Sequence, residues 1–72
     1  MGNKKVELTE LGKRIKTLRK AKGYSQTQLA HLVDKDQQSI QRLEAGNINP
    51  SYIYLLEIAK GLDIDLSELI KF

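Results

Sequence analysis

Signals that end one helix and begin the next recur at short intervals along this chain. Gly23 follows an apolar repeat and suits the left-handed conformation beyond a helix end. Ser25, with Gln28 three residues later, has the pattern of a capping box that starts a second helix. Asp36 and Gly46 bracket a third segment in the same way, as an N-cap and a terminating glycine. The spacing of these signals predicts short helices joined by tight turns.

Apolar spacing places the helices between these signals and predicts no strand. Leu8, Leu11, Ile15 and Leu18 recur at helical spacing before Gly23. The further expected helices cover residues 25–33, residues 37–45, a segment that follows Pro50 and ends near residues 61–63, and a short terminal segment. The expected core stripe of the fourth helix is Tyr52, Leu55, Leu56, Ala59 and Leu62. Asp65 and Glu68 have the spacing of another capping box, for the terminal helix. The fold class is therefore predicted as all-α with five short helices.

Length and composition favour one small domain over residues 1–72. The apolar fraction of 40% with 29% charged residues is typical of a globular domain rather than a disordered tail. Cysteine is absent, which excludes disulfides and favours a reducing compartment. The longest apolar run, residues 52–56, is far shorter than the roughly 20 residues of a membrane span. We therefore expect a cytoplasmic protein with no membrane partner.

Charge is distributed unevenly along the chain. Residues 1–22 carry eight Lys or Arg and two Glu, a net charge of +6, whereas residues 23–72 carry a net charge of −3. A strongly basic end fits a polyanionic partner, and it equally fits a solvated helix face. The basic segment 1–7, with Lys4 and Lys5, is predicted to be a flexible arm that either touches a nucleic acid or is simply disordered.

All of the glutamines lie between Gln26 and Gln41, and most of them fall in or near the third predicted helix. On a helical wheel, Ile40, Leu43 and Glu44 share one side, and Gln37 lies on the shoulder of the first turn. The opposite side carries Gln38, Gln41, Arg42 and Ala45. Two helices joined by a short turn, the second with a projecting polar face, describe a helix-turn-helix unit.

The stretch "LGKRIKTLRKAKGYSQTQLAHLVDKDQQSIQRLEAGNINPSYIYLLEIAKGLDIDLSELI", residues 11–70, resembles the phage repressor and Cro (XRE) family of helix-turn-helix transcriptional regulators. The matching positions are Arg19, Ser25, Gln26, Leu29, Ala30, Ile40, Glu44, Gly46, Pro50, Ser51, Leu55, Ile58, Ala59, Leu62 and Leu66. The resemblance implies a lambda-repressor-like fold, a third helix that enters the DNA major groove, and a homodimer.

The resemblance also implies which residues read bases. Family members that begin the third helix with "QQS" use these glutamines on bases, so Gln37, Gln38 and Gln41 are candidates for direct readout. A glutamine amide matches the adjacent acceptor and donor of adenine, N7 and N6. Arg42 either forks onto guanine O6 and N7 or grips a phosphate. Ala45 either allows close approach or touches a thymine methyl group.

Other matching positions would hold the protein on the sugar-phosphate backbone. The candidates are Gln26, Arg19, Asn47, Asn49, Ser51 and Lys35. The family pattern also pairs Arg19 with Glu44 as a structural ion pair. Asp34 stands where glycine is commonest in the turn, and it tolerates the left-handed conformation. Lys35 stands where the family usually has an apolar residue, so either its stem lies over the core or the turn is packed differently.

A dimer patch is expected from apolar residues that the core stripes do not use: Ile53, Tyr54, Ile70 and Phe72. A single module of this size makes few base contacts, and symmetry doubles them. His31, the only histidine, has no Cys or second His as a partner, so we expect a surface position and neither a metal nor a cofactor.

The leading prediction is a sequence-specific regulator that binds a palindromic operator in double-stranded DNA as a homodimer, without a small-molecule effector domain. A phage Cro-like repressor, a restriction-modification controller and a small host regulator all fit. The alternative is a protein-interaction module of the same fold, either an antitoxin or a bridging coactivator. An enzyme is excluded because no nucleophile-base pair, metal set or glycine-rich phosphate loop is present.

Overall fold

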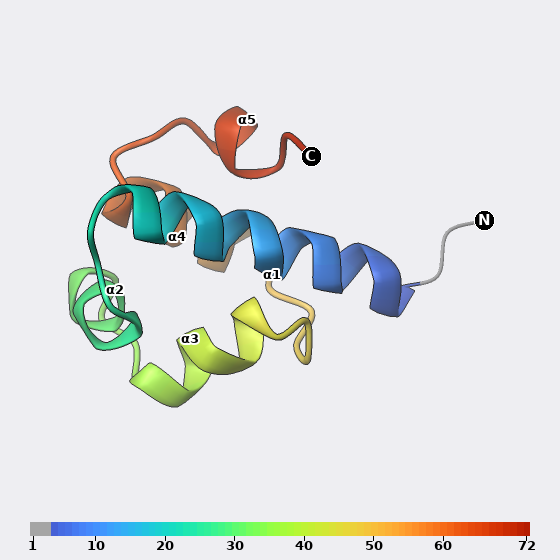
Figure 1. Ribbon diagram of the computed structural model, residues 1–72, viewed down its shortest axis with the longest axis horizontal. Helices are drawn as coiled ribbons and strands as arrows, with labels where there is room; N and C mark the ends of the chain where they lie inside the picture. The colour runs from blue at the N-terminus through green and yellow to red at the C-terminus, as the bar shows by residue number, and fades with distance from the viewer. Residues whose placement is uncertain (1–3) are drawn as a thin grey trace.

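The computed structural model describes residues 4–72 and folds them into five helices with no strand (Figure 1). The helices are α1 (Lys4–Ala21), α2 (Gln26–Leu32), α3 (Gln37–Glu44), α4 (Tyr52–Gly61) and α5 (Leu66–Leu69). In Figure 1, α1 runs along the molecule with α2 and α3 on one side and α5 on the other. The predicted all-α fold with five helices is confirmed.

The predicted capping signals start the two central helices. The Ser25 hydroxyl accepts from the backbone N–H of Gln28 at 3.0 Å, and the Gln28 side chain accepts from the Ser25 N–H at 2.8 Å. The Asp36 carboxylate accepts from the Ser39 N–H at 2.7 Å at the start of α3. These bonds satisfy N–H groups that have no partner inside their helices. Local signals therefore set the starts of both α2 and α3.

The capping box predicted for the terminal helix is wrong. Asp65 is the N-cap of α5, but its side chain makes no capping hydrogen bond. The Glu68 carboxylate instead lies 3.3 Å from the Arg14 guanidinium of α1. Arg14 Nε and Nη2 also donate to the Glu68 carbonyl, at 3.0 and 2.9 Å. Glu68 therefore connects α5 to α1 rather than capping its own helix.

The flexible arm predicted for residues 1–7 is wrong for residues 4–7, which form the first turns of α1. Residues 1–3 lie outside the described residues, so that part of the prediction stays a prediction. The Lys5 ammonium donates to the Gly46 carbonyl at 3.0 Å and to the Asn47 side-chain oxygen, just beyond α3. These contacts to a distant segment hold the basic end of the chain against the folded domain.

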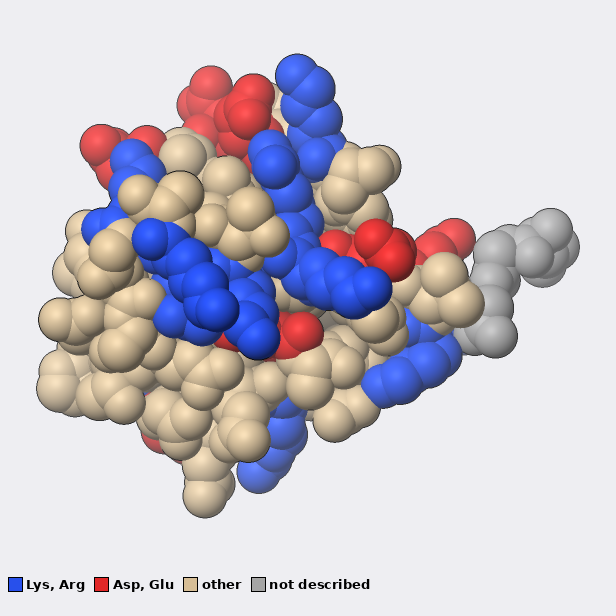
Figure 2. Space-filling view, viewed as in Figure 1, with Lys and Arg blue, Asp and Glu red and all other residues tan. Residues whose placement is uncertain are grey.

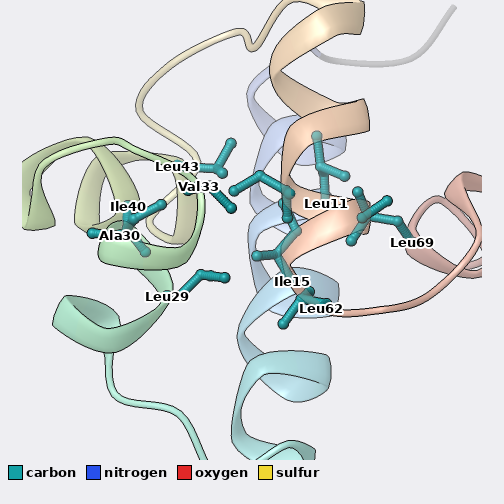
Figure 3. Close-up of a cluster of buried hydrophobic side chains, with 11 residues drawn as sticks. Leu11, Ile15, Leu29, Ala30, Val33, Ile40, Leu43, Leu62 and Leu69 are labelled. Atoms are coloured by element: carbon teal, nitrogen blue, oxygen red, sulfur yellow. The ribbon is translucent and has the colours of Figure 1, made fainter.

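The helices bury one cluster of aliphatic side chains between them (Figure 3). Its largest fully buried members are Ile15, Leu29, Ile40, Leu43, Ile58, Leu62 and Leu69. Burying each such side chain stabilises the fold by about 1.5–3 kcal/mol. The core position predicted for Tyr52 is wrong, since Tyr52 is 64% exposed at the start of α4 while Ile58 fills the core.

Close approach between α1 and α3 positions α3 in the fold. A Cβ atom at Gly12 would lie 2.3 Å from the Glu44 carbonyl oxygen, so the two backbones touch at this point. Before the opposite end of α3, its start, Asp34 adopts the left-handed conformation expected of it, with φ of 55°. The orientation of α3 is therefore set by a backbone contact to α1 and by a tight turn from α2.

Candidate nucleic-acid interface

One side of α3 faces the core and the other faces solvent. Ile40 and Leu43 are 0% and 1% exposed. The polar side predicted from the helical wheel lies on the surface, where Gln38, Gln41, Arg42, Ala45 and Asn47 line one shallow groove. We call these five residues the α3 groove. It brings together three of the four predicted base-reading residues and one predicted backbone contact.

Gln37, the fourth predicted base-reading residue, lies beside the α3 groove and bonds within the protein. Its side-chain nitrogen donates to the Gln26 side-chain oxygen at 2.7 Å. The Gln26 nitrogen in turn donates to Glu44 Oε1 at 3.0 Å. Both glutamines are only partly exposed. Gln26, predicted as a phosphate contact, therefore orients Gln37 and joins the start of α2 to both ends of α3.

Arg19 and Glu44 form a buried, bidentate ion pair. Arg19 Nε lies 2.6 Å from Glu44 Oε2, and Arg19 Nη2 donates to Glu44 Oε1 at 3.0 Å. Arg19 Nη1 donates to the Tyr24 carbonyl at 2.6 Å. The two side chains are 7% and 3% exposed. This burial contradicts the phosphate contact predicted for Arg19, whose guanidinium joins α1 to α3.

The loop between α3 and α4 borders the groove. Asn47, Asn49 and Ser51, all predicted backbone contacts, are exposed along it. The Ser51 hydroxyl accepts from the Tyr54 N–H at 3.0 Å and caps α4. The loop thus presents small polar side chains beside the base-reading residues.

Lys35 faces α4 rather than the groove. Its ammonium lies 3.3 Å from Glu57 Oε1 and 5.0 Å from the centre of the Tyr54 ring. The phosphate contact predicted for Lys35 stays a prediction, since this ion pair is partly exposed. Its ammonium lies over Tyr54, which packs against the buried cluster, and the expectation that its stem covers the core stays a prediction.

The four residues of the predicted dimer patch do not share one environment. Ile53, Ile70 and Phe72 are 61%, 49% and 63% exposed. Tyr54 is partly buried, and its hydroxyl lies 2.5 Å from the Ser39 hydroxyl of α3. This contact is not predictable from local sequence because it joins side chains of two separate helices.

Charged side chains separate on the surface. In Figure 2, Lys and Arg side chains gather over α1 across the middle of the visible face, and several Asp and Glu side chains lie toward α5. The surface over α2 and α3 carries few charged side chains in this view. Hydrogen-bonding amides thus dominate the α3 groove, and positive charge lies mainly on α1.

Among residues 4–72, neither a metal-binding cluster nor a membrane-spanning helix accompanies the α3 groove. His31 is exposed on α2, as expected. Within residues 4–72, no group of three or more His, Cys, Asp or Glu could hold a metal ion. None of the helices in this part of the chain is long and apolar enough to cross a membrane.

Comparisons with known proteins agree with the geometry. A family model described as Helix-turn-helix matches residues 15–69. The structure is similar to the crystal structure of the restriction-modification controller protein C.AhdI from Aeromonas hydrophila, with a TM-score of 0.91 and 37% sequence identity. That similarity covers 94% of this chain and 99% of the other. No curated protein matches the sequence significantly.

Proposed function

The chain belongs to the XRE family of helix-turn-helix DNA-binding transcription regulators, and on that premise we propose that it recognises a specific operator by inserting α3 into the DNA major groove. The family consists of regulators rather than enzymes. The observation that carries the proposal is the α3 groove, in which Gln38, Gln41 and Arg42 lie side by side on the exposed face of α3.

The chemistry of the groove suits base edges. Gln38 and Gln41 each offer a donor and an acceptor in one plane, which matches N7 and N6 of adenine. Arg42 can fork onto guanine O6 and N7 or onto a phosphate. Gln37 donates one N–H to Gln26, so it can offer a base only its second N–H and its side-chain oxygen, in the orientation that Gln26 sets. Gln38 and Gln41 are therefore the principal proposed readers of adenine.

Contacts to the sugar-phosphate backbone are proposed for the loop after α3. Asn47, Asn49 and Ser51 are exposed beside the groove, and short polar side chains of this kind commonly bond phosphate oxygens. We do not include Arg19, whose guanidinium is buried against Glu44, or Lys35, whose ammonium lies beside Glu57 of α4. The basic surface on α1 adds a general attraction for DNA.

We further propose that the protein binds a palindromic operator as a homodimer. One domain of this size presents few base-reading side chains, and two-fold symmetry doubles them. Ile53, Ile70 and Phe72 are exposed apolar residues outside the groove and fit a contact between two copies. The similarity to C.AhdI over nearly the whole chain favours control of restriction-modification genes as the regulatory role.

Selection from a pool of random DNA duplexes at about 0.15 M salt tests the proposal. The expected result is a two-fold symmetric site whose half-site centres lie about one helical turn apart, with adenines at fixed positions. The control is Gln38→Ala combined with Gln41→Ala, which should lose the preference at those adenines. Weak, salt-sensitive retention without any enriched sequence would refute specific recognition and favour the protein-interaction module.

A further inference from the structure

The first turns of α1 contact the end of α3 at the edge of the α3 groove. The Lys5 ammonium donates to the Gly46 carbonyl at 3.0 Å and to the Asn47 side-chain oxygen. A Cβ atom at Gly46 would lie 2.8 Å from the Thr9 backbone, so the loop is pressed against α1. Lys5 thus reaches a segment about forty positions away in the chain through tight packing.

The backbone at Gly46 and Asn47 forms a defined turn that ends α3. Gly46 has φ of 76°, and its N–H donates to the Leu43 carbonyl at 3.2 Å. The Asn47 N–H donates to the Arg42 carbonyl at 2.9 Å. The two bonds form a Schellman motif, which ends α3 and sets the direction in which Asn47 leaves it. A cation at the carboxyl end of a helix is also favoured by the helix dipole.

The contact with Lys5 determines which polar atom of the Asn47 side-chain amide stays available to bond a ligand. An ammonium group only donates, so it selects the amide oxygen as its partner. The amide nitrogen, with two N–H donors, is then directed away from Lys5. Asn47 is exposed and lines the α3 groove with Gln38 and Arg42. A donor at this position suits a phosphate oxygen, which can only accept.

We propose that Lys5 is a positioning residue of the DNA interface: it holds Asn47 with its amide nitrogen toward the DNA, where Asn47 bonds a phosphate oxygen. The inference rests on the proposed function, because it assigns a role at the same interface. It gives Lys5 an indirect role that works through Asn47.

Lys5→Met tests the proposal, with Lys4→Met as its matched control. Both changes remove one positive charge from the exposed start of α1, and among the described residues Lys5, not Lys4, bonds to the loop after α3. Binding to the selected duplex is measured by fluorescence anisotropy, and thermal unfolding is followed for each variant. We expect Lys5→Met to weaken binding roughly tenfold and Lys4→Met to weaken it by about threefold or less. Lys5→Arg should restore most of the affinity.

A double variant separates positioning from direct contact. If Lys5 acts through Asn47, Lys5→Met should have no further effect once Asn47→Ala is present. If Lys5 itself bound a phosphate, the two effects would add, and the salt dependence of binding would fall by about 0.9 in slope. Additive losses, or equal losses for Lys5→Met and Lys4→Met, would overturn the proposal.

The free protein supplies a readout that does not depend on DNA. The side-chain amide resonances of Asn47 should shift in Lys5→Met and not in Lys4→Met, and unchanged resonances would overturn the proposed contact. Lys5→Gln is measured beside Lys5→Met, so that the test survives a variant that folds poorly. Failure of the wild-type protein to bind any duplex would refute the proposed function, whereas the resonances test the Lys5 contact on its own.

Discussion

Glu44→Gln removes the negative charge from the buried ion pair with Arg19 while keeping nearly the same shape. The pair is 7% and 3% exposed and bidentate, and Glu44 also accepts from Gln26. The change leaves the Arg19 charge buried without its counter-charge, which typically costs about 3–5 kcal/mol. At roughly 0.05–0.15 kcal/mol per residue, a domain of this length has about 4–11 kcal/mol of stability. Glu44→Gln should therefore remove a large part of it.

Urea unfolding followed by circular dichroism measures the loss. With a slope near 1 kcal/mol per molar urea for a small domain, the midpoint should fall by about 3 M or more, or the variant should be unfolded without urea. Glu10→Gln is the control, because the Glu10–Lys13 pair is exposed and 3.8 Å apart. It should change the free energy of unfolding by about 0.5 kcal/mol or less.

Replacing both partners of the ion pair tests whether the loss of stability comes from an uncompensated buried charge or from altered packing. Arg19→Met with Glu44→Leu leaves no uncompensated charge, so the double variant should be more stable than either single variant. A loss for Glu44→Gln as small as that for Glu10→Gln would refute the reasoning. So would a double variant that loses the sum of the two single losses.

Three further predictions concern the groove and its support. Gln38→Ala should weaken binding to the selected duplex by about 1–3 kcal/mol and leave binding to a scrambled duplex nearly unchanged, as measured by anisotropy; equal losses would make Gln38 a backbone contact. Gly46→Ala should lower the free energy of unfolding by about 2 kcal/mol or more, because the added Cβ strains the left-handed backbone and also meets α1. Gly23→Ala is the control: its backbone is also left-handed but nothing lies within 4 Å of the added Cβ, so it should cost only about 1–2 kcal/mol. Equal urea midpoints for the two variants would contradict the clash with α1. Tyr54→Phe should cost about 0.5–1.5 kcal/mol by removing the bond to Ser39, and calorimetry should show no further loss when Ser39→Ala is added to it.

The correct sequence predictions concern local structure. The capping box of Ser25 and Gln28 and the cap of Asp36 join groups only three residues apart, so neighbouring residues decide them. The two faces of α3 follow from helical periodicity alone. The starts of α2 and α3 and the polar face of α3 were therefore predictable before any tertiary contact was known, and the family was predictable from the resemblance of residues 11–70.

The wrong predictions depend on how the helices pack together, which local sequence does not fix. Glu68 has the spacing of a capping residue, but packing brings Arg14 to it. Tyr52 fits the apolar stripe of its helix, but the core reaches only the residues that follow it. In each case local sequence allowed more than one partner or environment.

The sequence by itself determined where α2 and α3 begin and which face of α3 is polar, because those properties depend on side chains within one or two turns of each other. Only the tertiary structure decided which polar groups remain on the surface. Packing buries the Arg19 guanidinium against Glu44 and brings Lys5 to Asn47. A long polar side chain can serve either the fold or a ligand, and the neighbours that packing supplies select between the two.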